Sequence, residues 1–452
     1  MSSEIFKAYD IRGIYGEELD EKLAYKIGNA IVRELSAKKL AVGRDARPHG
    51  ESLMKSLIEG INDAGCDVVE LGMITTPMLW YSSWNLDVDG AVSVTASHNP
   101  IEYNGVKICR KNAVPVGLDS GLANIRDIAL DGDMEIAKNR GNITRVDLKE
   151  EYFDFVASFA NFGNKKFNVV IDCANTMGVL DLEIYKKLSD NISYSQLYCD
   201  LSNPYSAHEA NPLNVDTLTE LRQKVVDENA DLGIAYDGDA DRIGFIDETG
   251  EVIPMDLITG LVAKILLKDN AGSVVLYDLR SSMSVKEVIE ENGGIAHECR
   301  VGHAYIKLQM SEENALFAGE LSGHYYYKVN KNGELSTFTA ITLLNLMAKT
   351  GKKISELVKE LRRYYHSGEI NSKVDDADKI IKKLKDKYSD GKISNLDGLK
   401  ISYWNINPKG SRWWFNVRLS NTEPVMRLNL EADSKEFMEA KKNELLDIIK
   451  NS

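Results

Sequence analysis

The chain has 452 residues, more than one hydrophobic core normally organises, so we expect three or four domains. Its formal net charge of -14 argues against nucleic acid or an anionic membrane as a partner, because both require a cationic face. Small phosphorylated ligands stay compatible with this charge, since a few Arg and Lys side chains in one cleft can hold a phosphate.

The five cysteines are odd in number and widely spaced, and no CxxC pair occurs. We therefore expect neither a disulfide framework nor a zinc site, and we predict that the cysteines are small buried side chains. The N-terminal segment lacks a basic stretch followed by an apolar run, and apolar stretches such as 257–267 are too short to span a bilayer. These features predict a cytoplasmic enzyme.

Short apolar runs rich in β-branched residues alternate with amphipathic stretches along most of the chain, which is typical of α/β folds. We call each repeat of this alternation a round. The first round predicts a strand at 41–43, a helix at 51–63 and strands at 68–71 and 91–95. The second round predicts strands at 168–172 and 232–236. The third predicts strands at 273–277 and 315–318, with a helix at 284–292 between them.

The C-terminal segment differs from these rounds, with a charged helix predicted at 377–388 and strands at 401–404, 413–420 and 425–430. The predicted fold class is α/β, with three similar α/β domains plus a smaller C-terminal α+β domain around a central cleft. The expected domains are 1–150, 151–255, 256–367 and 368–452. Each α/β round has a strand that runs directly into a polar loop, and such loops at strand carboxyl ends usually carry the chemistry.

The first polar loop is TASHNP (95–100). Its Asn-Pro pair forces a turn, which predicts Ser97 at an exposed tip with His98 beside it. Such a hydroxyl could accept a phosphoryl group; a serine that only satisfies its own turn is the alternative. A further turn predicted at 104–105 would return Lys107 toward the same region.

The second loop, DGDADR (237–242), places carboxylates at every second position, in Asp237, Asp239 and Asp241. Two unit charges about 4 Å apart repel by about 4 kcal/mol at an effective dielectric near 20. A hard cation such as Mg²⁺ would relieve this repulsion and prefers oxygen ligands. The spacing also matches part of an EF-hand, but Arg242 stands where that loop needs glycine and the flanks are strand-like. A solvated acidic loop is the remaining alternative.

Two more loops offer groups suited to a sugar phosphate. The third, GELSGH (319–324), presents a carboxylate, a hydroxyl and an imidazole, a combination that suits sugar hydroxyls. The fourth, RLSNTEP (418–424), lies between two predicted strands and offers hydroxyls, an amide and a guanidinium, which suit a phosphate. Taken singly, each is equally well explained as an ordinary polar turn.

Together with YDIRG (9–13) and GRDAR (43–47), the four loops in this order resemble the α-D-phosphohexomutase family along essentially the whole chain. The chain is similar to the phosphomannomutase branch of this family in the motifs FKAYDIRG, YNGVKI, GHAYIK, SGEINSK and SNTEP. The form SNTEP in place of SGTEP separates it from phosphoglucosamine mutases. The Lys- and Asn-rich segment 325–337 departs from the family pattern.

The resemblance implies a role for each candidate site residue. One Mg²⁺ per chain would be held by Ser97, as the phosphoserine, with Asp237, Asp239 and Asp241. Sugar hydroxyls would be bound by Glu320 and Ser322, and the non-reacting phosphate by Arg418, Ser420, Asn421 and Thr422. The cleft would be lined by Arg12, Lys107, Arg242, Arg280 and His303. His98 would be a further catalytic residue, and Arg427 would be a further substrate-binding residue. Either His324 or Lys107 would act as the general acid and base.

The implied activity is the interconversion of mannose 1-phosphate and mannose 6-phosphate, and also of glucose phosphates. Hexose 1,6-bisphosphate would be the intermediate and activator. The alternatives are a phosphoglucomutase, a phosphoglucosamine mutase, a metal-dependent sugar phosphatase or a non-catalytic sugar-phosphate-binding protein. A phosphatase needs an activated water, which the fourth loop would exclude. Hexose phosphates are the expected partners, with no nucleic acid or membrane, and the chain is expected as a monomer or homodimer.

Overall fold

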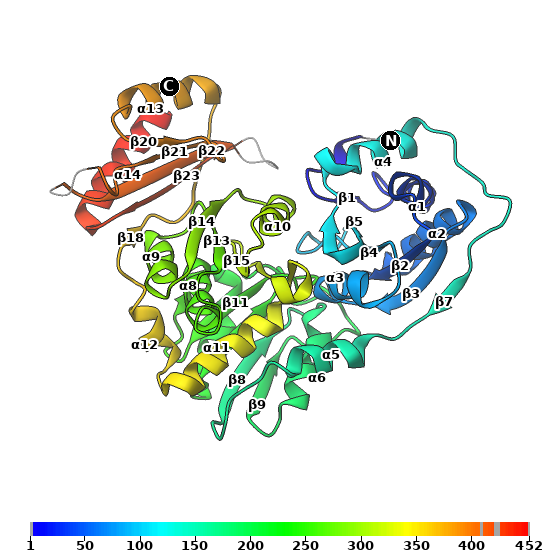
Figure 1. Ribbon diagram of the computed structural model, residues 1–452, viewed down its shortest axis with the longest axis horizontal. Coiled ribbons are helices and arrows are strands. Elements are labelled where there is room, and N and C mark those ends of the chain that lie inside the picture. The colour runs from blue at the N-terminus through cyan, green and yellow to red at the C-terminus, as the bar shows by residue number, and fades with distance from the viewer. Residues whose placement is uncertain (1–2, 407–409, 420–424, 451–452) are drawn as a thin grey trace.

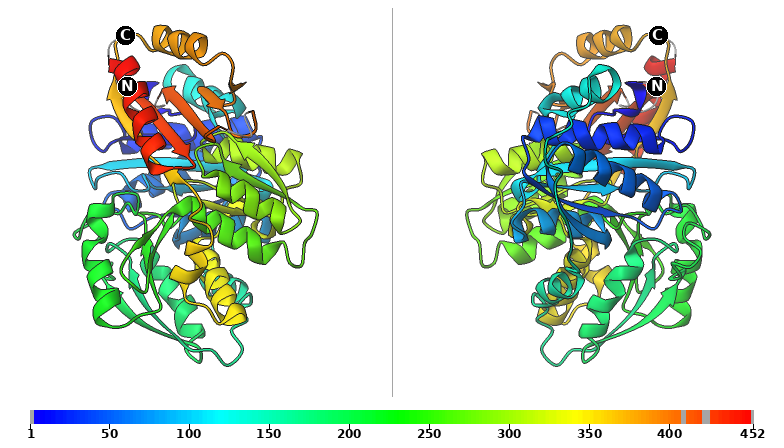
Figure 2. Two further views of the ribbon diagram at one scale, coloured as in Figure 1. Left: turned by 90° about the vertical axis from the view of Figure 1, so that its left-hand side faces the viewer. Right: turned by 90° about the vertical axis from the view of Figure 1, so that its right-hand side faces the viewer.

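The computed structural model describes residues 3–406, 410–419 and 425–450, and four β-sheets follow one another along this chain (Figure 1). We name the parts of the molecule that contain these sheets units I to IV. In both views of Figure 2, unit II lies at the bottom of the molecule and unit IV at the top. Three α/β units and a smaller α+β unit confirm the predicted fold class.

Unit I contains a seven-stranded sheet in the order β1-β5-β4-β2-β3-β7, with β6 beside β5. Its strands are β1 (Ile11–Ile14), β2 (Lys39–Arg44), β3 (Asp67–Met73), β4 (Gly90–Val94), β5 (Tyr103–Arg110), β6 (Val114–Pro115) and β7 (Ile143–Arg145). Its helices are α1 (Glu21–Leu35), α2 (Gly50–Asp63), α3 (Thr76–Asn85) and α4 (Leu122–Asp131). Helix α1 begins where the Asp20 carboxylate accepts a hydrogen bond from the Leu23 amide, an N-cap.

Units II and III each contain a five-stranded sheet, in the orders β12-β11-β10-β8-β9 and β14-β13-β15-β16-β17. Unit II comprises α5 (Lys149–Ala157), β8 (Phe167–Asp172), α6 (Gly178–Lys187), β9 (Ile192–Leu197), α7 (Thr219–Asp227), β10 (Leu232–Tyr236), β11 (Ile243–Asp247) and β12 (Val252–Ile253). Unit III comprises α8 (Met255–Leu266), β13 (Val274–Asp278), α9 (Met283–Glu291), β14 (Ile295–Cys299), α10 (His303–Glu312), β15 (Phe317–Gly319), β16 (Tyr325–Tyr327), β17 (Gly333–Glu334), α11 (Ser336–Thr350) and α12 (Ile354–Lys359).

One strand pattern recurs in units I, II and III. The first strand of the repeat (β2, β8 or β13) lies between two parallel neighbours. The neighbour that comes later in the chain (β4, β10 or β15) continues into an antiparallel hairpin. The hairpins β4–β5, β10–β11 and β15–β16 carry the loops that contain Ser97, the three aspartates and Glu320. The repeated topology therefore gives the three loops equivalent positions.

Unit IV has an antiparallel sheet in the order β18-β23-β22-β21-β20, with β19 also paired to β23. Its elements are β18 (Tyr365–His366), β19 (Ile370–Lys373), α13 (Ala377–Lys387), β20 (Lys392–Ser394), β21 (Leu399–Ser402), β22 (Trp413–Leu419), β23 (Val425–Ala432) and α14 (Lys435–Lys450). The fourth loop joins β22 to β23, and its residues Ser420, Asn421 and Thr422 lie outside the described part of the chain.

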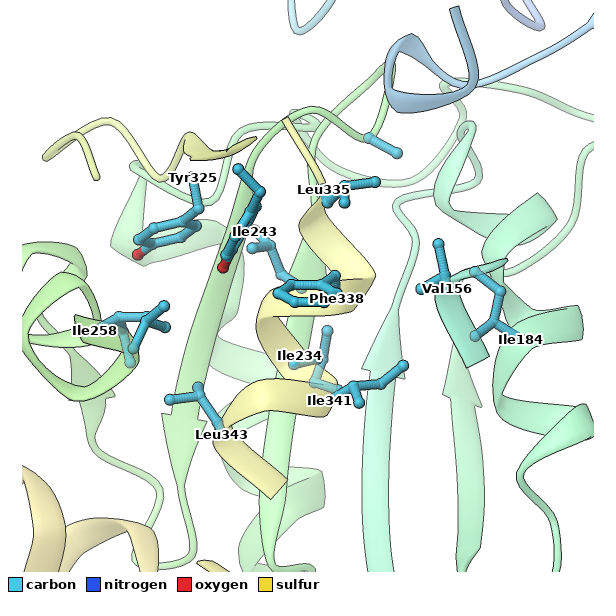
Figure 3. Packing of buried hydrophobic residues seen from close by; sticks show 14 of the residues in the cluster. Val156, Ile184, Ile234, Ile243, Ile258, Tyr325, Leu335, Phe338, Ile341 and Leu343 are labelled. Carbon is cyan, nitrogen blue, oxygen red and sulfur yellow. The ribbon is translucent and has the colours of Figure 1, made fainter. Parts of the chain in front are cut away.

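One large cluster of buried hydrophobic residues passes through units I, II and III, and each of these units also has a further cluster of its own. One cluster of buried residues includes Trp80 of unit I, Ile234 of unit II and Phe338 of unit III, whereas unit IV has a cluster of its own around Trp413 and Leu428. Figure 3 shows Phe338 and Ile341 of α11 beside Ile234 and Ile243 of the second sheet. Units I to III are thus packed as one body through apolar contacts.

Two local predictions were wrong. The turn predicted at 104–105 lies inside β5, where Gly105 lets β1 approach closely: a Cβ at this position would lie 2.0 Å from the Ile11 carbonyl oxygen. The strand predicted at 315–318 begins at Phe317, because Asn314 has a left-handed φ of 52° and the Ala315 amide still closes the end of α10. No helix in the described ranges is long and apolar enough to cross a membrane.

Candidate active site

The loops of units I and II meet at Ser97. Its Oγ donates a 3.1 Å hydrogen bond to Asp237 Oδ2, although the two residues are 140 positions apart. Gly238 makes this approach possible, because a Cβ there would lie 2.1 Å from the Ser97 carbonyl oxygen. Ser97 is consequently 1% exposed, and the prediction that it occupies an exposed tip was wrong.

The backbone at Ser97 has a left-handed conformation, with a φ of 52°. The Ser97 amide donates to Thr95 Oγ1 at 3.0 Å, and His98 Nδ1 lies 3.2 Å from Ser97 Oγ. Ala240 in the facing loop also has a positive φ, of 61°. Non-glycine residues in this region cost conformational energy, and they often occur at functional sites.

The three aspartates of the second loop form a buried cluster, in which one carboxylate oxygen from each lies within 4.8 Å of those of the other two. Burial and the neighbouring carboxylates raise the pKa of Asp237. Lys107 Nζ of unit I lies 2.6 Å from Asp239 Oδ2 and 2.5 Å from Asp241 Oδ2. Burial alone would lower the pKa of Lys107, but the two carboxylates raise it. The ammonium group therefore neutralises part of the cluster.

The cluster fits a divalent cation in its donor set. All three side chains offer oxygen atoms, and Asp239 Oδ1 is buried with no hydrogen-bond partner among the described residues. Thr76 holds the other oxygen of this carboxylate, with its Oγ1 2.7 Å from Asp239 Oδ2. A buried, unpartnered carboxylate oxygen is costly unless a cation or a donor satisfies it. Hard cations such as Mg²⁺ prefer ligands of this kind.

Unit III reaches the same cluster through His324. Its Nε2 lies 3.2 Å from Asp241 Oδ1, and its Nδ1 lies 2.8 Å from Ser322 Oγ and 3.3 Å from Glu320 Oε2. Burial opposes protonation of the ring, but the Asp241 and Glu320 carboxylates raise the pKa of His324 to about 9. The imidazole is therefore protonated near neutral pH, and it connects the cluster of three aspartates with the third loop.

Glu320 is buried and held in place by several donors. Its Oε1 accepts from the Gly302 amide at 3.2 Å, and its Oε2 accepts from Tyr326 Oη at 3.0 Å. Burial would raise the pKa of Glu320, but its contacts with His324 and Arg280 lower it. The side chain is an anionic acceptor, which suits the binding of sugar hydroxyls.

Basic and imidazole groups of units I to III surround the cluster. Arg12 donates to Asn99 Oδ1 at 2.6 Å and to Asp10 Oδ2 at 2.8 Å, and the Arg242 amide donates to Asp237 Oδ1 at 3.1 Å. Burial, together with these two arginines, lowers the pKa of His98. The imidazole beside Ser97 Oγ is therefore neutral.

His303 has both ring nitrogens buried without a hydrogen-bond partner in the described part of the chain. Its ring lies 5.3 Å from that of Tyr9, in an edge-on arrangement. Burial, and next the charge of Lys307, lower the pKa of His303. The neutral ring has one donor and one acceptor unused within the protein.

The arginines of unit IV join the site through a carboxylate. Arg418 and Arg427 occupy opposite positions on β22 and β23, and their guanidinium groups lie 3.5 and 3.2 Å from Glu369. Arg280 of unit III lies 3.2 Å from the same carboxylate and also forms an ion pair with Asp278. The structure therefore brings the predicted residues Arg280, Arg418 and Arg427 together.

Arg47 is the main site residue that the sequence reasoning did not assign. Its guanidinium is buried and donates to four backbone carbonyls of the first loop and the start of β5: those of Ser97 (2.9 Å), Asn99 (2.6 Å), Pro100 (2.6 Å) and Tyr103 (2.9 Å). The GRDAR motif was the available signal, but nothing in it indicates these partners. Thr76 was missed as well, and no local pattern marks it.

The whole chain matches models of one family, phosphoglucomutase/phosphomannomutase. Its alpha/beta/alpha domains I, II and III match residues 3–134, 150–250 and 254–365, and its C-terminal domain matches residues 369–448. The matched ranges contain most strands of all four sheets; β7 and β12 lie between them.

Curated relatives and solved structures agree with these models. A phosphomannomutase of Methanocaldococcus jannaschii is 39% identical, with 98% of this chain and 97% of the relative covered. A phosphomannomutase/phosphoglucomutase of Pseudomonas aeruginosa is 35% identical, with 97% and 94% covered. The crystal structure of a phosphoglucomutase/phosphomannomutase family protein from Burkholderia thailandensis superposes with a TM-score of 0.90 at 28% identity, covering 100% of this chain and 98% of that one. The chain therefore belongs to the phosphoglucomutase/phosphomannomutase family.

Proposed function

We propose that the protein is a phosphomannomutase that interconverts mannose 1-phosphate and mannose 6-phosphate and also acts on glucose phosphates. The contact between Ser97 Oγ and Asp237 Oδ2 carries this proposal, because it places a nucleophilic hydroxyl at a cluster of cation-binding oxygens. Relatives at 32–39% identity over the whole chain bear that name, and one is named for both sugars. The proposal includes the domain division 1–150, 151–255, 256–367 and 368–452.

In the proposed reaction Ser97 carries the phosphoryl group. A sugar hydroxyl forms a bond to phosphorus while the bond from phosphorus to Ser97 Oγ breaks, which gives a hexose 1,6-bisphosphate. The bisphosphate turns over in the site, and its other phosphate returns to Ser97. Positioning and charge neutralisation are the main tasks of the protein in such a transfer. Hexose 1,6-bisphosphate would also activate enzyme that has lost its phosphate.

Asp237, Asp239 and Asp241 would hold one Mg²⁺ together with the phosphorylated Ser97. When bound, the ion would supply positive charge to the oxygens of the seryl phosphate. Nδ1 of the neutral His98 ring lies 3.2 Å from Ser97 Oγ, so this residue would contribute no positive charge to the seryl phosphate. Lys107 and His324 are the two candidates for proton exchange with the sugar hydroxyl, since both contact Asp241.

The remaining predicted residues would bind the substrate. Glu320 and Ser322 lie beside His324 and would bind sugar hydroxyls. The His303 ring, which has no hydrogen-bond partner among the described residues, and the guanidinium of Arg12 would also contact the ligand. Arg280, Arg418 and Arg427, with Ser420, Asn421 and Thr422, would hold the non-reacting phosphate. A guanidinium pairs well with phosphate oxygens through two parallel hydrogen bonds.

A first experiment combines mass measurement with activity. Purified active enzyme should carry about one phosphate, mapped to Ser97, because the covalent step requires it. Ser97→Ala should lower kcat by at least about a thousandfold, since the phosphoryl carrier is lost. Ser52→Ala, on the exposed face of α2, is the matched control. Undiminished turnover in Ser97→Ala would refute the mechanism.

The same preparation tests the metal and the sugar. Chelation should abolish activity and Mg²⁺ should restore it, because the buried carboxylates need a cation. Mannose 1-phosphate and glucose 1-phosphate should be converted with kcat/KM values within about a hundredfold, because Glu320 and Ser322 would bind the 3- and 4-hydroxyls, which the two sugars share. Glucosamine 1-phosphate should be poorer, since its ammonium group enters a site lined by Arg and Lys. A preference for glucosamine 1-phosphate in direct competition would contradict the phosphomannomutase assignment and place the chain in another branch of the family.

A further inference from the structure

Two cysteines of unit II lie side by side at the ends of neighbouring strands. Cys173 directly follows β8, and Cys199 lies two residues after the parallel strand β9; both strands are at the lower edge of Figure 1. The strands stay paired to this end, where the Cys173 amide donates to the Leu197 carbonyl at 3.2 Å. The two sulfur atoms are 3.1 Å apart. A disulfide bond of about 2.05 Å would require them to approach by only about 1 Å.

The two thiols have different surroundings. Cys173 is fully buried, whereas Cys199 is half-buried and therefore open to small reagents. Contact with the Cys173 side chain lowers the pKa of Cys199, and burial raises that of Cys173. An accessible thiol that ionises first, beside a buried second thiol, is the usual arrangement of an exchange-competent pair. Cys66, Cys109 and Cys299 are buried and lack such an arrangement in the described structure.

The turn after Cys173 supports the second loop, residues 237–242, which we call the aspartate loop. Thr176 Oγ1 donates to the Asp237 carbonyl at 3.2 Å, and the Met177 amide donates to the Gly238 carbonyl at 3.3 Å. The two residues between Cys173 and Thr176 are Ala174 and Asn175, and both have left-handed φ values, of 47° and 53°. Consecutive non-glycine residues in this region store conformational energy, which a displacement of Cys173 would allow the turn to release by changing its backbone conformation.

We propose that Cys173 and Cys199 form a reversible disulfide, with a low-molecular-weight disulfide of the glutathione class as oxidant, and that its formation displaces the aspartate loop. The Cys199 thiolate attacks one sulfur of the reagent, whose S–S bond breaks and releases one thiol. Cys173 then attacks Cys199 Sγ, and the second reagent thiol leaves. Two protein thiols are oxidised and one disulfide is reduced to two thiols. Only the activity readout of this inference rests on the proposed function.

Peptide mapping tests the disulfide without reference to activity. The full-length protein is equilibrated with oxidised and reduced glutathione in varied ratio, alkylated and digested with trypsin. We expect a cross-link between peptides 167–186 and 188–222, with the loss of two hydrogen atoms, which dithiothreitol reverses. Cys199→Ser should form no cross-link, and Cys199→Ala serves the same purpose if the serine variant folds poorly. Cys66→Ser is the matched control, which should keep the cross-link.

The coupling to the aspartate loop is measured on the same samples. Oxidised protein should lose up to about a hundredfold of its kcat, the effect of displacing a reacting group by about 1 Å. Reduction should restore it, and Cys199→Ser should keep full activity under both conditions. Glutathione attached to Cys199 without a cross-link would overturn the disulfide. A cross-linked protein with unchanged kcat would overturn the coupling, and inactive reduced protein would instead count against the proposed function.

Discussion

At the scale of single residues, the position of Ser97 depends on Arg47. The buried guanidinium gathers four carbonyls that would otherwise point toward one another, and Asp45 balances its charge at 3.2 Å. The Tyr205 ring lies on its other side, 4.2 Å away, and Tyr205 Oη donates to the Gly238 carbonyl at 3.4 Å. Arg47 therefore fixes the serine loop and also connects it with the aspartate loop.

Arg47→Ala should lower kcat by about a hundredfold with little change in KM, because Ser97 shifts while the substrate-binding residues stay in place. Unfolding free energy should also fall by about 3–5 kcal/mol, since Asp45 is left buried and unpaired. Arg47→Lys should recover only part of kcat, because an ammonium cannot reach four carbonyls in one plane. Arg145→Ala, on an exposed side chain of β7, should change neither quantity. A folded Arg47→Ala protein with wild-type kcat would contradict this role.

The contrast between Ser97 and Arg47 shows which residues a sequence can reveal. The aspartates and Ser97 lie in short, contiguous loops whose composition already indicates their chemistry. Arg47 and Thr76 act on partners about 50 and 160 positions away, with Thr76 bound to Asp239. Only the folded chain creates these contacts. The burial of Ser97 was missed for the same reason, because the covering residue Gly238 belongs to another unit.

At the scale of secondary structure elements, α11 is tied to unit II by a buried polar chain. Thr337 Oγ1 donates to Asp181 Oδ2 of α6, Tyr236 Oη lies 2.6 Å from Thr337 Oγ1, and Tyr185 Oη lies 2.8 Å from Tyr236 Oη. Asp181 Oδ1 is buried without a hydrogen-bond partner in the described ranges. Burial raises the pKa of Asp181 from 3.8 to about 7. The carboxyl group is thus neutral in the folded protein below this pH.

Asp181 should make the stability of the protein depend on pH. Between pH 4 and pH 7 the folded state holds a proton on Asp181 that the unfolded state has lost, so stability falls as pH rises through this window. A rise in pKa from 3.8 to about 7 corresponds to on the order of 4 kcal/mol. Asp181→Asn keeps an acceptor for Thr337 and removes the charge.

The test is the free energy of unfolding in urea for wild type and Asp181→Asn. The free energy of unfolding of the variant should rise relative to that of the wild type from pH 4.5 to about pH 7 and then level off, because Asp181 is ionised in both states above its folded pKa. Glu183→Gln, an exposed position on the same helix, should show no such trend. A constant difference between wild type and Asp181→Asn over this range would mean that Asp181 does not titrate there.

Elements with a strong apolar pattern were predicted to within one or two residues. Strand β10 and helix α13 are examples, because β-branched runs and a charged amphipathic stretch give clear signals. The Asn-Gly pair at 104–105 was wrongly predicted to form a turn, because its glycine instead allows the close approach of a neighbouring strand. That contact, with Ile11, is made by a segment more than ninety residues away. Turn residues alone therefore do not distinguish a bend from a crowded strand.

At the scale of the whole molecule, unit IV is attached differently from the others. One apolar cluster joins units I to III, whereas unit IV contacts unit III through a small apolar cluster of Met283, Trp404 and Trp414 and through several buried charges. Lys400 Nζ lies 2.6 Å from Glu298 and donates to the Leu279 carbonyl at 2.8 Å, and Glu431 accepts from the Met283 amide at 2.8 Å. A partly polar interface of this kind can separate and reform at lower cost than a large apolar core.

Glu369 is central to this attachment, because it lies among the guanidinium groups of Arg280, Arg418 and Arg427. Burial would raise the pKa of Glu369, but the three arginines lower it, so the carboxylate stays charged. It provides the negative charge that a substrate phosphate would provide in the proposed reaction. Without it, three cations would face one another across the boundary between units III and IV.

Glu369→Gln should therefore loosen unit IV when no other anion is present. We expect a loss of about 1.5–3 kcal/mol of unfolding free energy in phosphate-free buffer, the usual contribution of charge-assisted hydrogen bonds. Inorganic phosphate should restore it more effectively than chloride at equal ionic strength, because phosphate binds the arginines in place of the carboxylate. Glu298→Gln, which removes one carboxylate opposite a single lysine of the same interface, should respond to both salts alike. Equal rescue of Glu369→Gln by chloride and phosphate would show that the three arginines do not form a phosphate site, and it would leave the Ser97 centre unaffected.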